Sequence, residues 1–387
     1  MAALSRPDLE SALLQRARQG PPLLLTGPPG SGKTTLLRQL ATRLATEGAV
    51  PIHLDLMGAC STPERFVIAA LRAIPAEGLG QRLPQATEIR RIADSGRLHG
   101  VDAANALFRL WATLDDADGR PVVLLLDEAT EIRSLSYFPG LRHVQDPFAA
   151  ALNARKRGTV LATSFPTAAR KLWSFGTLAA RPLTADEIAP ALRSRADSEA
   201  VARLSFGWPR YVSILLEAMA ERRTDLASVW AEEMALGDRL ETACRHTYET
   251  LLLRSRGYGI CKAALGIIAQ EEGLNLTAIV PRLGRTPGAV RDYLQWLVGV
   301  DAIRMVKKRY VYVDGVLRQW VRLHARGSVP TRAELAAAAR ELLTAEMAPP
   351  RATLAPDATA PPTLPAPESE PLSPTSTSRR DSLIEID

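Results

Sequence analysis

The hydrophobic pattern in the first half of the chain predicts buried strands separated by amphipathic helices. Apolar runs without polar alternation are typical of strands covered on both faces of a parallel sheet. The predicted strands span residues 23–25, 50–56, 121–128, 159–164 and, as a short edge strand, 178–183. Apolar residues at helical spacing predict helices over 8–19, after the first strand, and over 62–74 and 101–114. We therefore expect a doubly wound α/β domain that ends near residue 190.

One segment of this domain has no clear pattern. Residues 75–100 are polar and only weakly periodic. We interpret them as a surface insertion.

The second half of the chain changes to helical periodicity. Helices over 191–204, 209–220 and 226–234 predict a compact helical lid. Three further helices are predicted over 259–271, 276–283 and 286–298, followed by a hairpin where polar and apolar residues alternate from Ile303 to Val313. Three helices and a basic hairpin in this order are typical of a winged helix-turn-helix.

These patterns divide the chain into five parts. The predicted parts are an α/β domain over 1–190, a lid over 191–248, a winged helix over 249–330, a terminal helix over 331–344 and a tail over 345–387. The tail is rich in Pro, Ser and Thr without periodicity, and we expect it to be disordered. Its last residues place Leu383, Ile384 and Ile386 between acids, which suits docking on a protein partner; a frayed terminus is the alternative.

Composition adds few constraints. The chain has 387 residues, 46% of them hydrophobic, and no apolar run approaches the ~18 residues needed to cross a bilayer. The N-terminus lacks a basic segment followed by an apolar one, so we expect a soluble, cytoplasmic protein without a secretory signal or a membrane partner. The three cysteines and five histidines match no metal or redox spacing, so the sequence indicates no zinc site.

Charge is unevenly distributed. The net charge is +6, but residues 251–326 hold thirteen Lys and Arg against five Asp and Glu, a local excess of +8. This excess indicates a polyanionic partner for the predicted winged helix.

A phosphate-binding loop lies between the first strand and its helix. Gly27-Pro28-Pro29-Gly30-Ser31-Gly32-Lys33-Thr34 fits G-x-x-x-x-G-K-[ST] at every defined position. Glycines let main-chain N–H groups approach phosphates closely, and the helix that follows directs its positive end toward them. We expect Lys33 to contact the β- and γ-phosphates of ATP, Thr34 to bind Mg²⁺, and Thr35 to complete the nucleotide site.

Two acids complete a candidate hydrolytic centre. Asp127 and Glu128 end a buried strand, at the sheet edge where α/β proteins bind ligands. Asp127 is a candidate for the Mg²⁺ shell and Glu128 for orienting and polarising the attacking water. At the end of the next strand, Thr163 or Ser164 is placed to act as a polar sensor of the γ-phosphate.

A further candidate lies in the predicted lid. Gly207-Trp208-Pro209-Arg210 interrupts the helices and puts Arg210 in the first turn of the next one. A basic residue there opposes the helix dipole, which indicates a nearby anion. The alternative is an ordinary helix start at Pro209 with a solvated Arg210.

Together these motifs resemble the AAA+/STAND group of P-loop ATPases, and within it the archaeal-type ATPases and the origin-recognition and replication-initiator ATPases. The resemblance covers about residues 6–326. It implies ATP and Mg²⁺ as cofactors, with Lys33 and Thr34 on phosphate and metal, Asp127 on metal, Glu128 activating water and Thr163 as first sensor. Pro209 or Arg210 would contact the nucleotide from the lid, because this sequence satisfies both the G-x-P and the G-x-x-R patterns of the two groups.

Many members of this group supply an arginine from a neighbouring subunit. Arg170 is the best-placed candidate here, with a solvated helix position as the alternative, so a homo-oligomer remains open.

Two hypotheses describe the kind of molecule on which such an ATPase would act. The first is a switch that acts on DNA in replication, transposition or transcription, with contacts from Arg285, Arg291, Gln295, Lys307, Lys308 and Arg309. The second is a signalling or defence ATPase whose winged helix and tail engage proteins. Winged helices attached to such ATPases also pack on the nucleotide domain, so basic composition alone does not decide between these readings.

Overall fold

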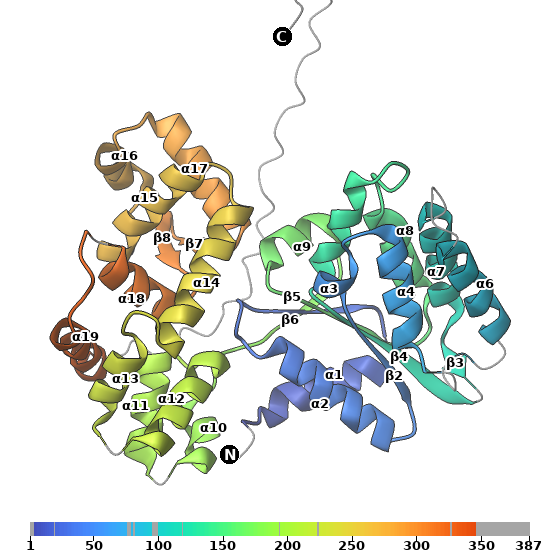
Figure 1. Cartoon of the computed structure of the whole chain (residues 1–387), viewed down its shortest axis with the longest axis horizontal. Helices are drawn as coiled ribbons and strands as arrows, with labels where there is room; N and C mark the ends of the chain where they lie inside the picture. The colour runs from blue at the N-terminus through green and yellow to red at the C-terminus, as the bar shows by residue number, and fades with distance from the viewer. Residues whose placement is uncertain are drawn as a thin grey trace, which may run out of the picture. The chain divides into compact units, whose positions relative to one another are not determined.

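The computed structural model describes residues 4–345, with gaps at 19, 76–78, 80–81, 95–99, 118, 193, 223 and 326 (Figure 1). The predicted tail beyond residue 345, including Leu383, Ile384 and Ile386, lies outside the described residues. Among the residues that are described, no helix has the length and apolar character required to cross a bilayer.

A parallel sheet forms the centre of the N-terminal half. Its strands run in the order β2-β4-β5-β1-β6, and a short sixth strand, β3, pairs antiparallel with β4. Their bounds are β1 Leu23–Thr26, β2 Val50–Asp55, β3 Asp116–Ala117, β4 Arg120–Asp127, β5 Thr159–Thr163 and β6 Gly176–Ala179. The predicted α/β fold with a parallel sheet is confirmed.

Helices cover both faces of this sheet (Figure 1). Val123 and Leu125 of β4 pack against α1 (Pro7–Arg18) and α2 (Lys33–Thr46), whereas Leu124 and Leu126 point into the core on the opposite face. The elements of that second core are α3 Leu56–Ala59, α4 Pro63–Ala73, α6 Leu83–Asp94, α7 Gly100–Thr113, η2 Ala129–Tyr137, α8 Gln145–Ala154 and α9 Pro166–Leu172. Burial on both faces explains why β4 shows no polar alternation in the sequence.

The predicted edge strand is shifted. It spans Gly176–Ala179 rather than 178–183, and it pairs with β1. The Ala180 N–H makes the last bond to the Thr26 carbonyl at 2.7 Å. Leu183 instead packs in the hydrophobic core of the lid, so the apolar residues that suggested a longer strand serve another part of the molecule.

The interpretation of residues 75–100 as a weakly periodic surface insertion missed a helix in their central part. Residues Leu83–Asp94 form α6, with Ala86, Ile89 and Ala93 buried against the core. Two of these three contacts are alanines, whose weak hydrophobicity leaves little periodic signal in the sequence.

A helical region follows the sheet. It consists of α10 Ala185–Ile188, η3 Ala189–Ala191, α11 Arg195–Ser205, α12 Pro209–Glu221, α13 Leu226–Glu233 and α14 Arg239–Arg254. The boundary predicted between residues 248 and 249 falls inside α14, whose buried face continues from Leu240 through Tyr248 to Leu252. These helices share one hydrophobic core with the C-terminal elements, so a boundary at that point would divide a continuous, packed helix.

The C-terminal elements follow the predicted order, with one helix, α18 (Gly315–His324), that the sequence analysis did not predict between the hairpin and the terminal helix. They are α15 Tyr258–Gln270, α16 Leu276–Leu283, α17 Pro287–Gly299, β7 Ile303–Val306, β8 Arg309–Tyr312, α18 Gly315–His324 and α19 Arg332–Thr344. Asn275, Thr286 and Thr331 accept backbone N–H bonds at the starts of α16, α17 and α19, which fixes where these helices begin. β7 and β8 pair antiparallel through a two-residue turn.

Candidate active site

The phosphate loop joins β1 to α2 in a conformation that only glycine adopts readily. Gly30 and Gly32 have φ of +83° and +84°. A Cβ on Gly30 would lie 3.0 Å from the Cβ of Arg210, and one on Gly32 would lie 2.5 Å from Nη2 of Arg6. The two glycines therefore provide the turn and allow two arginines to approach the loop.

Lys33 occupies the centre of the loop. Its side chain is 4% exposed, and its Nζ donates to the carbonyls of Gly27 (2.9 Å) and Pro28 (3.1 Å) and to the Ser164 hydroxyl (2.9 Å). Burial lowers the pKa of Lys33, while Glu128 and Asp127 act in the opposite direction. Neutral acceptors and two nearby acids therefore hold this ammonium group where phosphates would lie.

Thr34 and Asp127 meet at the carboxyl end of the sheet. The Thr34 hydroxyl in the first turn of α2 donates to Oδ2 of Asp127, at the end of β4, at 2.6 Å. Within the described part of the chain, no group of three or more His, Cys, Asp and Glu residues could hold a metal. A metal at the Thr34–Asp127 pair would have few protein ligands, which suits Mg²⁺ because it keeps most of its waters.

Glu128 is held in an unusual backbone conformation. Its φ of 46° is left-handed, which is uncommon for a residue other than glycine and is often found at functional sites. One carboxylate oxygen accepts the Ser164 N–H at 2.9 Å, and the other accepts the Ser164 hydroxyl. Burial raises the pKa of Glu128, against the opposing effects of Lys33 and the Ser164 hydrogen bonds.

The structure does not bring Thr163 into this group. Its buried hydroxyl pairs with Thr130 Oγ1 at 3.0 Å and accepts the Phe165 N–H at 3.0 Å. Successive side chains of a strand point to opposite faces, so only the neighbouring Ser164 reaches Lys33 and Glu128. In this structure Ser164, and not Thr163, contacts Lys33 and Glu128, while the sensor role of either residue stays a prediction.

The lid sequence around Arg210 contacts the phosphate loop. The Arg210 N–H donates to the Gly30 carbonyl at 3.1 Å, and Nη1 lies 3.3 Å from the Thr247 hydroxyl of α14. Pro209 approaches Gly32, at 3.4 Å from the position a Cβ would take there. Both predicted lid residues thus lie next to the loop.

The other predicted nucleotide contacts contribute mainly backbone. Ser31 is buried, and its N–H donates to the Pro28 carbonyl at 3.1 Å, closing the turn. Pro29 is half-buried, and the Thr35 side chain is exposed in the first turn of α2. Main-chain N–H groups at the start of α2 have no partner within the helix and are available to phosphate.

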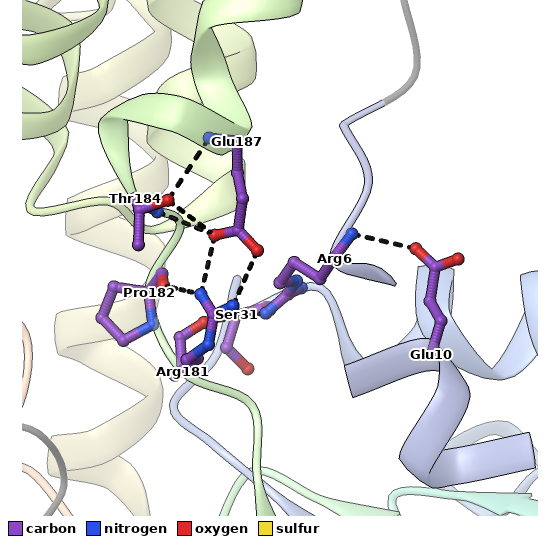
Figure 2. Close-up of polar contacts among 7 residues, drawn as sticks. All are labelled: Arg6, Glu10, Ser31, Arg181, Pro182, Thr184 and Glu187. Carbon is purple, nitrogen blue, oxygen red and sulfur yellow. Dashed lines mark hydrogen bonds and ion pairs between the residues drawn. The ribbon is translucent and has the colours of Figure 1, made fainter. Parts of the chain in front are cut away.

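Arg6 is a site residue that the sequence reasoning missed. It is 5% exposed and donates to the Ser31 carbonyl (2.7 Å) and to the Arg181 carbonyl (2.9 Å). Figure 2 shows it reaching from the segment before α1 toward the phosphate loop and toward Arg181, which pairs with Glu187 of α10. Burial lowers the pKa of Arg6 to about 10. A basic residue directly before a helix start was the available signal, as it was for Arg210.

The remaining candidates lie away from the loop. Arg170 is exposed, and its Nη2 lies 3.3 Å from the Thr167 hydroxyl of its own helix. All six residues proposed for DNA contact are exposed: Arg285, Arg291, Gln295, Lys307, Lys308 and Arg309. Tyr293 and Trp296 of α17 pack against the hydrophobic core, and Leu297 is part of it.

Comparison with known families agrees with this geometry. Residues 8–147 match the family described as AAA ATPase domain. The matched segment holds the phosphate loop, Asp127 and Glu128, whereas Ser164 and Arg210 lie beyond it. A search of curated protein sequences found no match.

Solved structures agree at the level of the fold. A Walker-type ATPase of Pyrococcus abyssi is similar over 83% of this chain and 96% of its own, with a TM-score of 0.63 and 16% identity. Cdc6p from Pyrobaculum aerophilum is similar over 87% of this chain and 91% of its own, with 14% identity and a TM-score of 0.36. The Holliday junction branch migration motor RuvB of Thermotoga maritima is similar over 80% of this chain and 92% of its own, with 15% identity and a TM-score of 0.33. The Pyrococcus ATPase therefore shares its fold with most of this chain.

Proposed function

We propose that this protein is an ATP- and Mg²⁺-dependent switch whose C-terminal domain acts on DNA. The observation that carries the nucleotide part is the Thr34–Asp127 pair beside Lys33 and Glu128. A hydroxyl, an ammonium and two carboxylates from α2 and β4 meet at one edge of the sheet. This is the set that phosphoryl transfer to water requires.

The loop fits a triphosphate and its metal. Gly30 and Gly32 leave no side chain between the backbone and a ligand, and the start of α2 directs N–H groups toward it. Thr34 and Asp127 would hold Mg²⁺, and bound Mg²⁺ neutralises charge on the transferred phosphate. Lys33 would exchange its bonds to the Gly27 and Pro28 carbonyls for phosphate oxygens.

Glu128 is the group placed to handle the attacking water. Its carboxylate lies beside Lys33 and in contact with Ser164, so it can orient a water molecule by accepting a hydrogen bond from it. In the arrangement observed, Ser164 occupies both oxygens of this carboxylate. Activation therefore requires Ser164 or Glu128 to move.

Arg6 and Arg210 provide the coupling to the lid. Each touches the phosphate loop, and each also contacts the lid or the linker that leads into it. A phosphate in the loop would compete for both guanidinium groups and change the lid angle. In this way nucleotide state would reach the C-terminal domain.

The proposed DNA contact rests on unpaired basic residues of a winged helix. Arg285, Arg291, Lys307 and Lys308 are exposed, and no ion pair to any of them exists within the described residues. Burial raises the pKa of Tyr310 of β8, and Arg291 of α17 acts in the opposite direction, so the charge of Arg291 lies near the hairpin. Phosphate binding is the expected use of such a surface.

The hairpin turn itself supports this role. Lys307 and Lys308 have φ of 50° and 63°, a combination that two-residue turns normally assign to Asn and Gly. Left-handed backbone is unfavourable for lysine by about 1 kcal/mol or more per residue. Such strain is characteristic of functional positions, and here it presents two ammonium groups at the tip of the hairpin.

The double variant Lys307→Asn/Lys308→Gly tests whether the hairpin turn contacts DNA. The new residues suit the turn, so the melting temperature should rise. Affinity for duplex DNA should nevertheless fall, and the slope of log affinity against log salt should lessen by roughly one to two. Arg256→Gln/Lys262→Gln, which removes the same charge from exposed positions elsewhere in the domain, serves as the control and should leave both DNA values unchanged.

Unchanged DNA affinity in the turn variant, or absence of DNA affinity in the natural protein, would contradict the proposed DNA contact. The alternative from the sequence, a switch acting on protein, would then be favoured. Loss of a nucleotide-dependent partner on deleting residues 378–387, with ATP turnover preserved, would support that alternative.

A further inference from the structure

One contact between the C-terminal half and the elements beside the sheet is made by Arg254. This residue ends α14, and its guanidinium lies 4.3 Å from the centre of the Phe165 ring. Its Nη1 also lies 2.8 Å from the Glu131 carboxylate in η2. Phe165 is 5% exposed and belongs to the core of the lid and C-terminal helices, although it directly follows β5 of the sheet.

A second contact is made by Asp301, in the connection between α17 and β7. Its carboxylate accepts the Thr167 N–H at 3.0 Å and the Thr167 hydroxyl at 2.6 Å. No side chain of the preceding residue caps α9, so the C-terminal half provides the cap. Burial raises the pKa of Asp301 to about 6, so at neutral pH the carboxylate is ionised and can accept both bonds.

Both contacts fall on one short segment of the ATPase domain. Phe165 and Thr167 follow Ser164 directly, and Ser164 is the residue that occupies Glu128 and contacts Lys33. Asp301 also lies in the connection from α17 to the hairpin, and α17 and the hairpin carry the proposed DNA surface. The chain therefore leads from α17 to Asp301, Asp301 contacts Thr167, and three residues before Thr167 in the chain Ser164 contacts the candidate catalytic carboxylate.

We propose that Arg254 and Asp301 are positioning residues that restrain ATP turnover. They fix residues 165–167, and this keeps Ser164 hydrogen-bonded to both oxygens of Glu128, so that the carboxylate is not free to engage water. A polyanion bound to α17 and the hairpin would displace Asp301, loosen the segment and release Glu128. This inference rests on the proposed ATPase switch and adds how its C-terminal domain controls it.

The test is basal ATP turnover, measured without DNA, in Arg254→Ala and Asp301→Gly. Glycine keeps the left-handed backbone of position 301, where φ is 56°, and deletes the cap. We expect kcat to rise about three- to tenfold, a change that corresponds to roughly 0.6–1.4 kcal/mol of lost restraint. KM for ATP should stay within about twofold, because the loop contacts to phosphate are unaltered.

Two comparisons separate this role from a merely structural one. Arg256→Ala removes the same charge two residues away, at an exposed position whose side chain makes no ion pair or hydrogen bond to the ATPase domain among the described residues, and should match the natural kcat. Thr167→Val removes the hydroxyl on the other side of the Asp301 contact and should raise kcat, whereas Thr167→Ser keeps it and should not. A structural defect would lower kcat in all of these variants instead of raising it in a chosen few.

Basal kcat in Arg254→Ala, Asp301→Gly and Thr167→Val equal to that of Arg256→Ala would overturn the proposal. A failure of the proposed DNA binding would look different. The natural protein would then not bind duplex DNA, while Arg254→Ala and Asp301→Gly would still turn over ATP faster than the natural protein. Absence of ATP turnover in the natural protein and in every variant would contradict the ATPase switch, and with it the restraint proposed for Arg254 and Asp301.

Discussion

At the scale of single residues, the site depends on two buried charges whose proton affinities shift in opposite directions. Burial lowers the pKa of Lys33 and raises that of Glu128, because each loses solvation of its charged form. Their proximity partly offsets both shifts. An acid whose pKa lies above its ordinary value is better suited to accept a proton near neutral pH than an exposed glutamate.

This shift predicts the pH dependence of turnover. Glu128 must be ionised to act on water, so kcat should fall as pH drops through its raised pKa and recover as pH rises. The acid limb should therefore lie above the ~4.3 of an unperturbed glutamate. Ser164 lowers the pKa of Glu128 through its hydrogen bonds, so Ser164→Ala should move the limb to still higher pH.

Steady-state kcat measured between pH 4.5 and 8 decides this point. Thr163→Ser, which keeps its hydroxyl facing Thr130, is the matched control and should not move the limb. An acid limb at the position of an ordinary glutamate, unaffected by Ser164→Ala, would show that Glu128 does not determine the rate.

Residues within contiguous motifs were predictable, whereas residues set by side-chain direction were not. The loop and the Asp127–Glu128 pair follow from spacing and from their places at strand ends, because parallel strands end at one edge. The choice between Thr163 and Ser164 depends on which face of β5 each side chain takes. Arg6 acts through two main-chain carbonyls about 25 and 175 residues away in sequence, a relation that no local pattern records.

At the scale of elements, the sheet is held together partly by buried polar contacts at its periphery. Arg155, after α8, is 6% exposed and donates to the carbonyls of Trp111 (3.0 Å), Leu114 (2.7 Å) and Val122 (2.7 Å). These carbonyls lie at the end of α7 and at the beginning of β4. One guanidinium therefore connects a helix end to the strand that carries Asp127 and Glu128.

Arg155→Ala should destabilise the domain. Three buried carbonyls would lose their donors, at about 1 kcal/mol each, so the free energy of unfolding should fall by roughly 3 kcal/mol. Lys156→Ala, at the exposed neighbouring position, should change it by less than about 0.5 kcal/mol. Chemical denaturation of both variants measures the difference, and equal midpoints would exclude this structural role.

Element boundaries were predictable where a local signal exists. Thr62, Asn275 and Thr286 cap helices that begin where the sequence indicated, because capping is a local interaction. Helix α6 was missed because alanines dominate its buried face. The continuity of α14 past residue 248 reflects packing shared by the lid and the C-terminal elements, which is not local.

At the scale of the whole molecule, the described parts of the chain are joined at functional points. Arg6 and Arg210 link the phosphate loop to the lid, and Arg254 and Asp301 link the C-terminal elements to the segment after Ser164. Nucleotide would therefore act through the contacts of Arg6 and Arg210, and DNA through those of Arg254 and Asp301. Such reciprocal coupling is what a switch requires.

The central claim is that the loop around Gly30 binds ATP with Mg²⁺ and that Glu128 supports its hydrolysis. The most direct measurement is equilibrium binding of labelled ATP in magnesium buffer, paired with turnover, for the natural protein, Lys33→Ala and Glu128→Gln. We predict that Glu128→Gln binds as tightly as the natural protein while kcat falls by about 10²-fold or more, and that Lys33→Ala loses at least about tenfold in affinity. Binding of ATP by Lys33→Ala as tight as by the natural protein, or full turnover by Glu128→Gln, would contradict the account.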